Sequence, residues 1–74
     1  MTRLTKTQIK ALRWLIANEA IARVDRFGRI SNIRGELSPH SSATFLRLML
    51  SGHCIRHAGP DHITITDLAL EAIR

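Results

Sequence analysis

The stretch LSPHSSATFLRLMLSGHCIR, residues 37–56, carries the strongest signals for the fold. Ser38 suits the N-cap position of a helix, where its hydroxyl accepts a hydrogen bond from the first turn. Pro39 suits the first helical position, because the N–H that proline lacks would have no helical partner there. Gly52 is a good C-terminal cap, since glycine adopts the left-handed conformation that ends many helices. These signals predict a helix that begins at Pro39 and ends near Ser51.

The predicted helix is apolar over most of its circumference and carries one narrow polar edge. The edge consists of residues at helical spacing, namely His40, Thr44, Arg47 and Ser51. A helix that lies in the major groove of DNA needs such an edge, because two or three side chains must reach the bases while the rest packs on a core. The alternative interpretation is that this edge is the solvated side of a core helix.

The residue types at this edge match the chemistry of DNA recognition. A guanidinium group such as that of Arg47 suits the O6 and N7 atoms of guanine, and Thr44 and His40 suit base edges or a thymine methyl group. Ser41 and Ser42, together with the first backbone N–H groups of the helix, suit a phosphate. The sequence therefore predicts a helix that contacts DNA through these five residues.

After the predicted helix, the apolar pattern changes from a helical period to alternation. Residues 53–58 and 62–65 are predicted as two strands, joined by a turn at residues 59–61 that contains glycine and proline. Thr66 suits the N-cap of a last helix over residues 67–74. We therefore expect a two-stranded hairpin followed by a helix.

Before the quoted stretch, the pattern predicts one long and one short helix. Apolar residues recur at helical spacing as far as Ala20, behind a threonine N-cap. A longer helix would place Arg23 in the middle of its apolar face, so we end the helix near Ala20. Residues 21–30 then form an irregular arm or a short strand. The second, short helix is predicted over residues 32–37.

The order helix, short helix, tight turn, helix, two-stranded hairpin and helix resembles the winged helix-turn-helix DNA-binding family, most closely its MarR-like branch. Residues 37–42 and 48–56 resemble the family's helix start and its entry into the wing, and residues 63–73 resemble its I-T-L-T-x-x-G-x-x-A-L segment. Ala69 stands where that segment usually has glycine. The resemblance implies a mainly α fold of three or four helices with a small two-stranded β-hairpin, the wing, in a single domain over residues 1–74.

The resemblance also implies DNA contacts outside the recognition helix. A wing lies against the backbone or the minor groove, so Arg56, His57 and His62 become candidate contacts. Arg34 becomes a candidate phosphate contact, because the predicted recognition helix carries a single formal charge. The chain as a whole has 11 Lys and Arg against 6 Asp and Glu, a net charge of +5 that favours a polyanionic partner. A solvated basic surface is the equally weighted alternative.

Catalytic and metal-binding patterns are weak in this sequence. Residue types that bind zinc occur close together at His53, Cys54, His57 and His62. Strand alternation, however, places Cys54 and His57 on opposite faces, and the chain has only 1 cysteine, so we expect neither a metal site nor a cofactor. The chain also has no paired carboxylates, no Ser/His/Asp set and no Gly-rich phosphate loop. We therefore do not expect an enzyme.

Composition places the chain among globular proteins of a reducing compartment. It is 45% hydrophobic and 23% charged, and its longest apolar run, residues 14–17, is too short to cross a bilayer. The first residues do not have the apolar core of a secretory signal. A single cysteine cannot form an internal disulfide. We therefore expect a cytoplasmic protein without membrane contact, and the cytoplasm of a prokaryote or of a phage's host, or any other cytosol, would suit it.

Together these patterns predict a small winged-helix protein that binds double-stranded DNA, as a transcriptional regulator or a DNA-architecture factor. The small core of a 74-residue chain and the broad apolar belt of residues 39–51 also predict a homodimer. The alternative belongs to another class: a winged-helix protein–protein module, such as a phage-type inhibitor or adaptor. Such a module would use its apolar or basic surface on a protein target.

Overall fold

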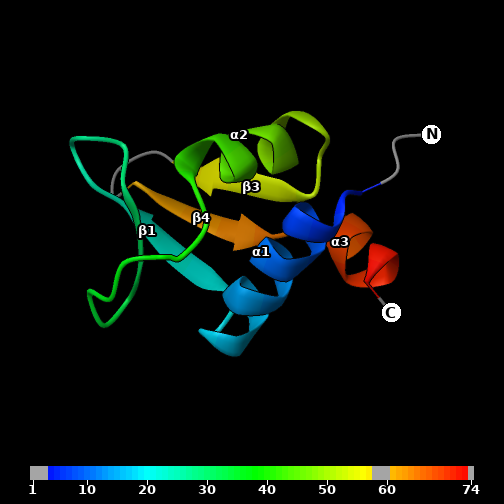
Figure 1. Cartoon of the computed structure of the whole chain (residues 1–74), viewed down its shortest axis with the longest axis horizontal. Helices are drawn as coiled ribbons and strands as arrows, with labels where there is room; N and C mark the ends of the chain where they lie inside the picture. The colour runs from blue at the N-terminus through cyan, green and yellow to red at the C-terminus, as the bar shows by residue number, and fades with distance from the viewer. Residues whose placement is uncertain (1–3, 58–60, 74) are drawn as a thin grey trace.

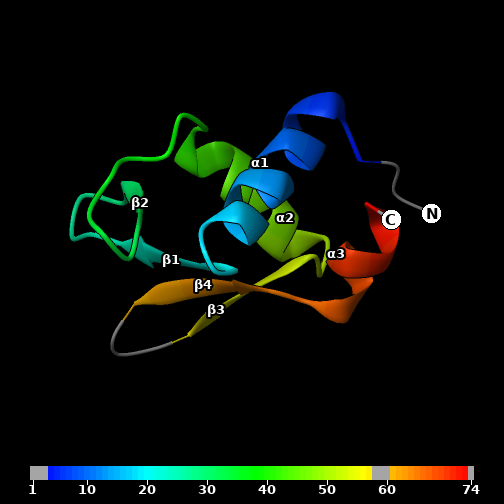
Figure 2. The ribbon, with the colours of Figure 1, turned by 90° about the horizontal axis from the view of Figure 1, so that it is seen from below.

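The computed structural model describes residues 4–57 and 61–73 as three helices and a four-stranded antiparallel sheet (Figure 1). In chain order the elements are α1 Lys6–Ala17, β1 Ile21–Val24, β2 Ile30–Asn32, α2 Ser42–Leu50, β3 Cys54–His57, β4 His62–Ile65 and α3 Asp67–Ala72. The strand order across the sheet is β2-β1-β4-β3. Helices α1 and α2 lie on one face of the sheet and α3 lies at its end, whereas no helix of the described chain covers the opposite face (Figure 2).

The four-stranded sheet makes the fold α+β, so the predicted mainly α, winged helix-turn-helix fold with a two-stranded wing is wrong. Strands β3 and β4 do form the predicted hairpin. Strand β4 also pairs with β1, with Ala22 opposite Ile63 and Arg23 opposite His62, and β2 pairs with the other side of β1. The hairpin is therefore one edge of a larger sheet rather than a free wing.

The two additional strands lie in a segment where the alternation of apolar and polar residues is too short to identify a strand. In β1, Ala22 is buried and Arg23 is exposed, so its residues do alternate between the two faces. An alternation of four residues does not by itself identify a strand. The strand that connects β1 to the hairpin, β4, lies far along the chain. The Arg23 side chain, which limited the length of the predicted helix, lies on the uncovered face of the sheet.

Helix α1 begins at its capping residues and ends before the predicted Ala20. Thr5 is the N-cap: its hydroxyl accepts the Gln8 N–H at 3.1 Å, and Gln8 Oε1 accepts the Thr5 N–H at 2.9 Å. The last helical residue is Ala17. The helix stops there because Glu19 and Ala20 adopt left-handed φ angles of 70° and 61°, which reverse the chain into β1.

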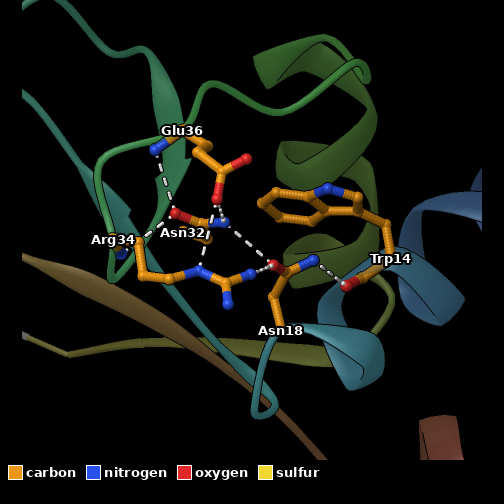
Figure 3. Close-up of polar contacts among 5 residues, drawn as sticks. All are labelled: Trp14, Asn18, Asn32, Arg34 and Glu36. Atoms are coloured by element: carbon orange, nitrogen blue, oxygen red, sulfur yellow. Dashed lines mark hydrogen bonds and ion pairs between the residues drawn. The ribbon is translucent and has the colours of Figure 1, made fainter.

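The predicted short helix over residues 32–37 is wrong, because the Asn32 side chain organises a turn there (Figure 3). Asn32 is the last residue of β2 and is only 3% exposed. Its Oδ1 accepts the backbone N–H groups of Arg34 at 3.0 Å and Glu36 at 2.9 Å. Its Nδ2 donates to Asn18 Oδ1 at 2.9 Å. A side-chain amide that binds neighbouring backbone N–H groups competes with helix formation.

Helix α2 begins at Ser42 rather than at the predicted Pro39, because the chain first forms a separate turn. In that turn the Ser38 hydroxyl accepts the His40 N–H at 3.0 Å. Ser41 takes the N-cap role that the sequence analysis assigned to Ser38. The N-cap chemistry was therefore predicted correctly, but its position was wrong.

The elements after α2 follow the prediction more closely. Gly52 has the left-handed φ of 83° that ends α2 as expected. The two strands predicted over 53–58 and 62–65 are present as β3 and β4, and Thr66 is the N-cap of α3. The predicted turn residues 59 and 60 and the last residue, Arg74, lie outside the described residues.

The core lies between the two larger helices and the inner face of the sheet. Its largest fully buried side chains are Leu12, Leu15, Phe45, Leu48 and Ile63. Trp14 packs edge-on against Phe45, with ring centroids 6.0 Å apart, and so joins α1 to α2. Burial of each such aliphatic side chain stabilises the fold by about 1.5–3 kcal/mol. The core therefore determines which side of α2 remains at the surface.

We predict that Asn32→Ala lowers the free energy of unfolding by about 2 kcal/mol. The substitution removes a buried amide and leaves the backbone N–H groups of Arg34 and Glu36 without their acceptor. Urea unfolding followed by circular dichroism measures the loss.

The matched control is Arg34→Ala, which removes an exposed ion pair with Glu36 (Nε to Oε1, 3.2 Å) but keeps the buried amide. We expect this variant to lose less than about 0.5 kcal/mol. Equal losses in the two variants would contradict the central role of Asn32.

Candidate nucleic-acid interface

Helix α2 presents a different face to solvent from the polar edge that its sequence predicts. Of the predicted edge residues within or after the helix, Arg47 is exposed, whereas Thr44 and Ser51 are half-buried. Thr44 Oγ1 lies 3.1 Å from Ser41 Oγ, and Ser51 Oγ donates to the Leu48 carbonyl at 3.1 Å. The predicted polar edge faces partly inward, because the large buried side chains of α2 fix the side of the helix that packs on the core.

The exposed face of α2 is mainly aliphatic, with Arg47 as the only charged side chain of the helix. Ala43, Leu46 and Leu50 follow one another along this face, and the two leucines are 53% and 79% exposed. Sequence reasoning missed this face, because a helix that is apolar nearly all round gives no internal sign of which apolar side is buried. The spacing of Leu46, Leu50 and Arg47 on one side was the only available signal.

The beginning of α2 opens onto a hollow that it shares with the β1–β2 loop. The hollow, about 380 Å³, is lined by Arg29 from the loop and by His40, Ser41 and Ser42 from the beginning of α2. The first N–H groups of a helix have no partner within it and carry a partial positive charge. The structure thus brings together three of the predicted contact residues, His40, Ser41 and Ser42, beside a guanidinium group.

The β1–β2 loop is organised by the carboxylate of Asp25. This carboxylate accepts the backbone N–H groups of Arg29 at 2.8 Å and Phe27 at 2.9 Å, and it forms an ion pair with Arg29 Nε at 2.8 Å. These interactions, above all the backbone N–H of Arg29, lower the pKa of Asp25 below its ordinary value of 3.8. Arg26, in the same loop, forms no ion pair within the described residues. The loop therefore presents an unneutralised cation beside α2.

Three basic side chains follow one another along α1 at helical spacing. Lys6, Lys10 and Arg13 are exposed, and none of them forms an ion pair within residues 4–57 and 61–73. The first turn of α1 lies beside α2, where Thr7 and Arg47 line one shallow groove of about 350 Å³. The positive surface around Arg47 therefore continues onto the beginning of α1. We call these three residues the α1 basic row.

The structure places the predicted phosphate contact Arg34 away from the beginning of α2. Arg34 lies in the Asn32 turn, where its Nη2 donates to Asn18 Oδ1 at 3.3 Å and its Nε pairs with Glu36 (Figure 3). It lines a separate hollow at the C-terminal end of α1, together with Asn18 and Ile33. Arg34 therefore does not join the other predicted contacts.

The three residues predicted for the wing lie on two different faces of the sheet. Arg56 lies on the inner face, where it lines an apolar groove of about 340 Å³ with Leu46 of α2 and forms an ion pair with Asp61 at 3.3 Å. His57 and His62 face each other across β3 and β4 on the uncovered face, with their rings stacked 4.5 Å apart. Strand alternation causes this separation. Only Arg56 shares a face with α2.

The candidate zinc ligands do not converge in the described part of the chain, which holds no group of three or more such residues. The buried His53 has Nδ1 2.6 Å from Ser51 Oγ. Burial also raises the pKa of the Cys54 thiol to about 11, which keeps it protonated at neutral pH. Cys54 faces the core and His57 is exposed, so the expected separation of these two residues is confirmed.

No protein-family profile, curated protein or solved structure matches the chain. The resemblance of residues 37–56 and 63–73 to the MarR-like branch therefore stays a prediction from the sequence. Within the described residues, no helix is both long enough and apolar enough to cross a membrane.

We predict that the β1–β2 loop loosens as the pH falls below 3.8. A lowered pKa means that the folded loop favours the charged carboxylate of Asp25. Its stabilising effect is therefore present above 3.8 and is lost as the carboxyl group takes up a proton. In a ¹⁵N NMR titration, the amide signals of Phe27 and Arg29 should shift together with this protonation.

Asp25→Ala is the matched variant for this titration, because it removes the carboxylate at every pH. Its Phe27 and Arg29 signals should already be displaced at neutral pH and should no longer respond to acid. Wild-type signals that stay constant through the whole acid titration would show that the carboxylate does not hold the loop.

Proposed function

We propose that the protein binds double-stranded DNA with the exposed side of α2 in the major groove, as a transcriptional regulator or a DNA-architecture factor. The position of Arg47 carries this proposal. Arg47 is exposed on α2 and has no ion-pair partner among the described residues. An unneutralised guanidinium on the outer side of a helix suits a bidentate contact with guanine. Leu46, beside it, suits a thymine methyl group.

Phosphate contacts on either side of α2 fit the same arrangement. The beginning of α1, the helix of the α1 basic row, borders one side of α2, and the β1–β2 loop, which includes Arg26, borders the other. Arg29 and Arg56 contribute less to the field around α2, because each pairs with a carboxylate. Such backbone contacts orient a protein on DNA and make its affinity depend strongly on salt, whereas Arg47 supplies the contact that reads sequence.

The distribution of acidic residues favours the same surface. Three of the described carboxylates pair with arginines, and those outside the ion pairs are Glu19, Asp67 and Glu71. Glu19 follows the end of α1, and the other two belong to α3, at the end of the molecule opposite the beginning of α2 (Figure 1). A polyanion that approaches α2 therefore meets mainly cations.

We predict that Arg47→Ala weakens binding to a preferred duplex by about 1–3 kcal/mol, or roughly 5- to 150-fold. The fold should be unchanged, because the side chain is exposed. Fluorescence anisotropy measures the affinity for a labelled duplex selected from a random pool. The wild-type affinity must also fall steeply as salt is raised.

Arg23→Ala is the charge-matched control, since Arg23 lies on the uncovered face of the sheet. We expect it to lose little duplex affinity. Equal losses of duplex affinity in the two variants would show that Arg47 acts only through its charge and not through a contact with a base. A loss of thermal stability in Arg47→Ala without any loss of affinity would show that the side chain belongs to the core.

A protein partner is the second candidate for α2, and the exposure of Leu46 and Leu50 favours it. Exposed leucines on one helix face are typical of a contact between chains. Leu50 is the last residue of α2 and lies about 4.5 Å along the helix axis from Arg47, so a protein contact there competes with the proposed DNA contact. A second copy of the chain fits best, because an 8.3 kDa chain has a small core of its own.

For this contact we predict a homodimer at micromolar concentration, which Leu50→Gln converts to a monomer. Sedimentation equilibrium measures both states. Leu70→Gln is the matched control, because it changes an exposed leucine on α3, and this variant should remain dimeric. A wild-type protein that sediments at 8.3 kDa at every concentration would contradict the predicted homodimer. A dimer that persists in Leu50→Gln would place the contact elsewhere.

A further inference from the structure

The uncovered face of the sheet carries side chains in two cross-strand rows. The strand register places Ser31, Arg23, His62 and His57 side by side in one row, which we call the polar row. The neighbouring row consists of Ile21, Thr64 and Ile55, which we call the aliphatic row. Their chain neighbours Ala22, Ile63 and Cys54 are buried on the inner face, so alternation directs both rows outward. No helix of the described chain lies over them (Figure 2).

At its β3 and β4 end, the polar row contains the planar imidazole rings of two histidines. The His57 and His62 rings are stacked, with centroids 4.5 Å apart and planes inclined by 10°. His57 Nε2 lies 2.8 Å from Thr64 Oγ1, and this hydrogen bond holds the orientation of the ring. Each ring covers one face of the other, so the outer face of the His57 ring, at the edge strand β3, is the face on which an unpaired base stacks.

Arg23 supplies the positive charge of this face. It is exposed, lies next to His62 in the register and forms no ion pair within the described residues. The two carboxylates at the border of the face, Asp25 and Asp61, are paired with Arg29 and Arg56. With both carboxylates paired, Arg23 is the unpaired charge of this face among the described residues, which favours an anionic ligand over a metal cation at the two histidines.

A hollow beside the polar row has the size and the walls that a small planar ligand needs. It measures about 530 Å³, and its walls include Ile21, Ile33, Ser31, Arg23 and His62, together with the two ion-paired carboxylates, Asp25 and Asp61. Aliphatic walls with a few polar groups bind a flat ring by contact and orient it by hydrogen bonds. The guanidinium of Arg23 stacks on a base and also attracts the phosphate that follows it.

We propose that this uncovered sheet face binds a single-stranded nucleic acid. One base occupies the hollow beside Arg23, the next stacks on the face of the His57 ring that His62 leaves open at the edge of the sheet, and the aliphatic row supports the sugars. A duplex does not fit this surface in the same way, because its base faces are hidden within the stack. The site lies on the opposite side of the sheet from α2, so it does not depend on the duplex contact of Arg47.

Fluorescence anisotropy with a labelled oligothymidylate of about 12 nucleotides tests this site. We expect the wild-type protein to bind it, and Arg23→Ala and His57→Ala each to lower the affinity roughly 5- to 100-fold. His57→Phe keeps a ring for stacking and should retain most of the affinity. Arg47→Ala should leave this affinity unchanged. Circular dichroism of each variant confirms that the fold is kept.

The possible outcomes separate this site from the duplex site. If Arg47→Ala lowers oligothymidylate binding as much as Arg23→Ala does, the strand lies on α2 and the sheet site is wrong. If His57→Phe loses as much affinity as His57→Ala, stacking on this ring is not the source of binding. Displacement of the oligonucleotide by polyglutamate at equal charge concentration would identify an acidic peptide as the occupant. A loss of oligothymidylate affinity that is confined to Arg23→Ala and His57→Ala supports the sheet site, even if the protein binds no duplex.

Discussion

The buried amide of Asn32 is the contact on which the arrangement of both surfaces depends. It joins the end of β2 to the turn over residues 33–36 and to Asn18 at the end of α1. Asn18 in turn donates to the Trp14 carbonyl at 2.8 Å (Figure 3). The Trp14 ring packs on Phe45 of α2. Because the turn leads directly into the segment before α2, this chain of contacts places the beginning of that helix. A helix over these residues would break it and remove the hollow beside the β1–β2 loop.

Strand alternation then divides the functional groups between the two faces of one sheet. Arg56 and His57 are neighbours in sequence, yet Arg56 lines the groove beside α2 and His57 lies on the uncovered face. A free wing would have allowed both to approach one duplex. In the four-stranded sheet, β1 holds β4 in place, and the polar row continues from His57 and His62 through Arg23 to Ser31. The described chain thus carries an arginine without an ion pair on each of two separate faces, Arg47 on a helix and Arg23 on a sheet.

Local signals in the sequence were sufficient where a structure depends on a few neighbouring residues. The N-cap of α3, the glycine after α2 and the β3–β4 hairpin belong to this group, because caps and short turns are decided within about one turn of chain. Local signals failed where two local structures compete. Both Ser38 and Ser41 suit an N-cap, and Asn32 suits either a helix or a turn. Burial of the Asn32 side chain, which depends on α1, selects the turn.

The sequence by itself determined the helix α1, the approximate extent of α2, the hairpin, α3 and the excess of positive charge. The tertiary structure alone decided that β1 and β2 complete a sheet, because they join it through β4, which is distant in the chain. It also decided which side of α2 is exposed. A helix that is apolar nearly all round has several sides that fit a core, and packing of Phe45 and Leu48 against α1 and the sheet leaves Leu46, Arg47 and Leu50 at the surface.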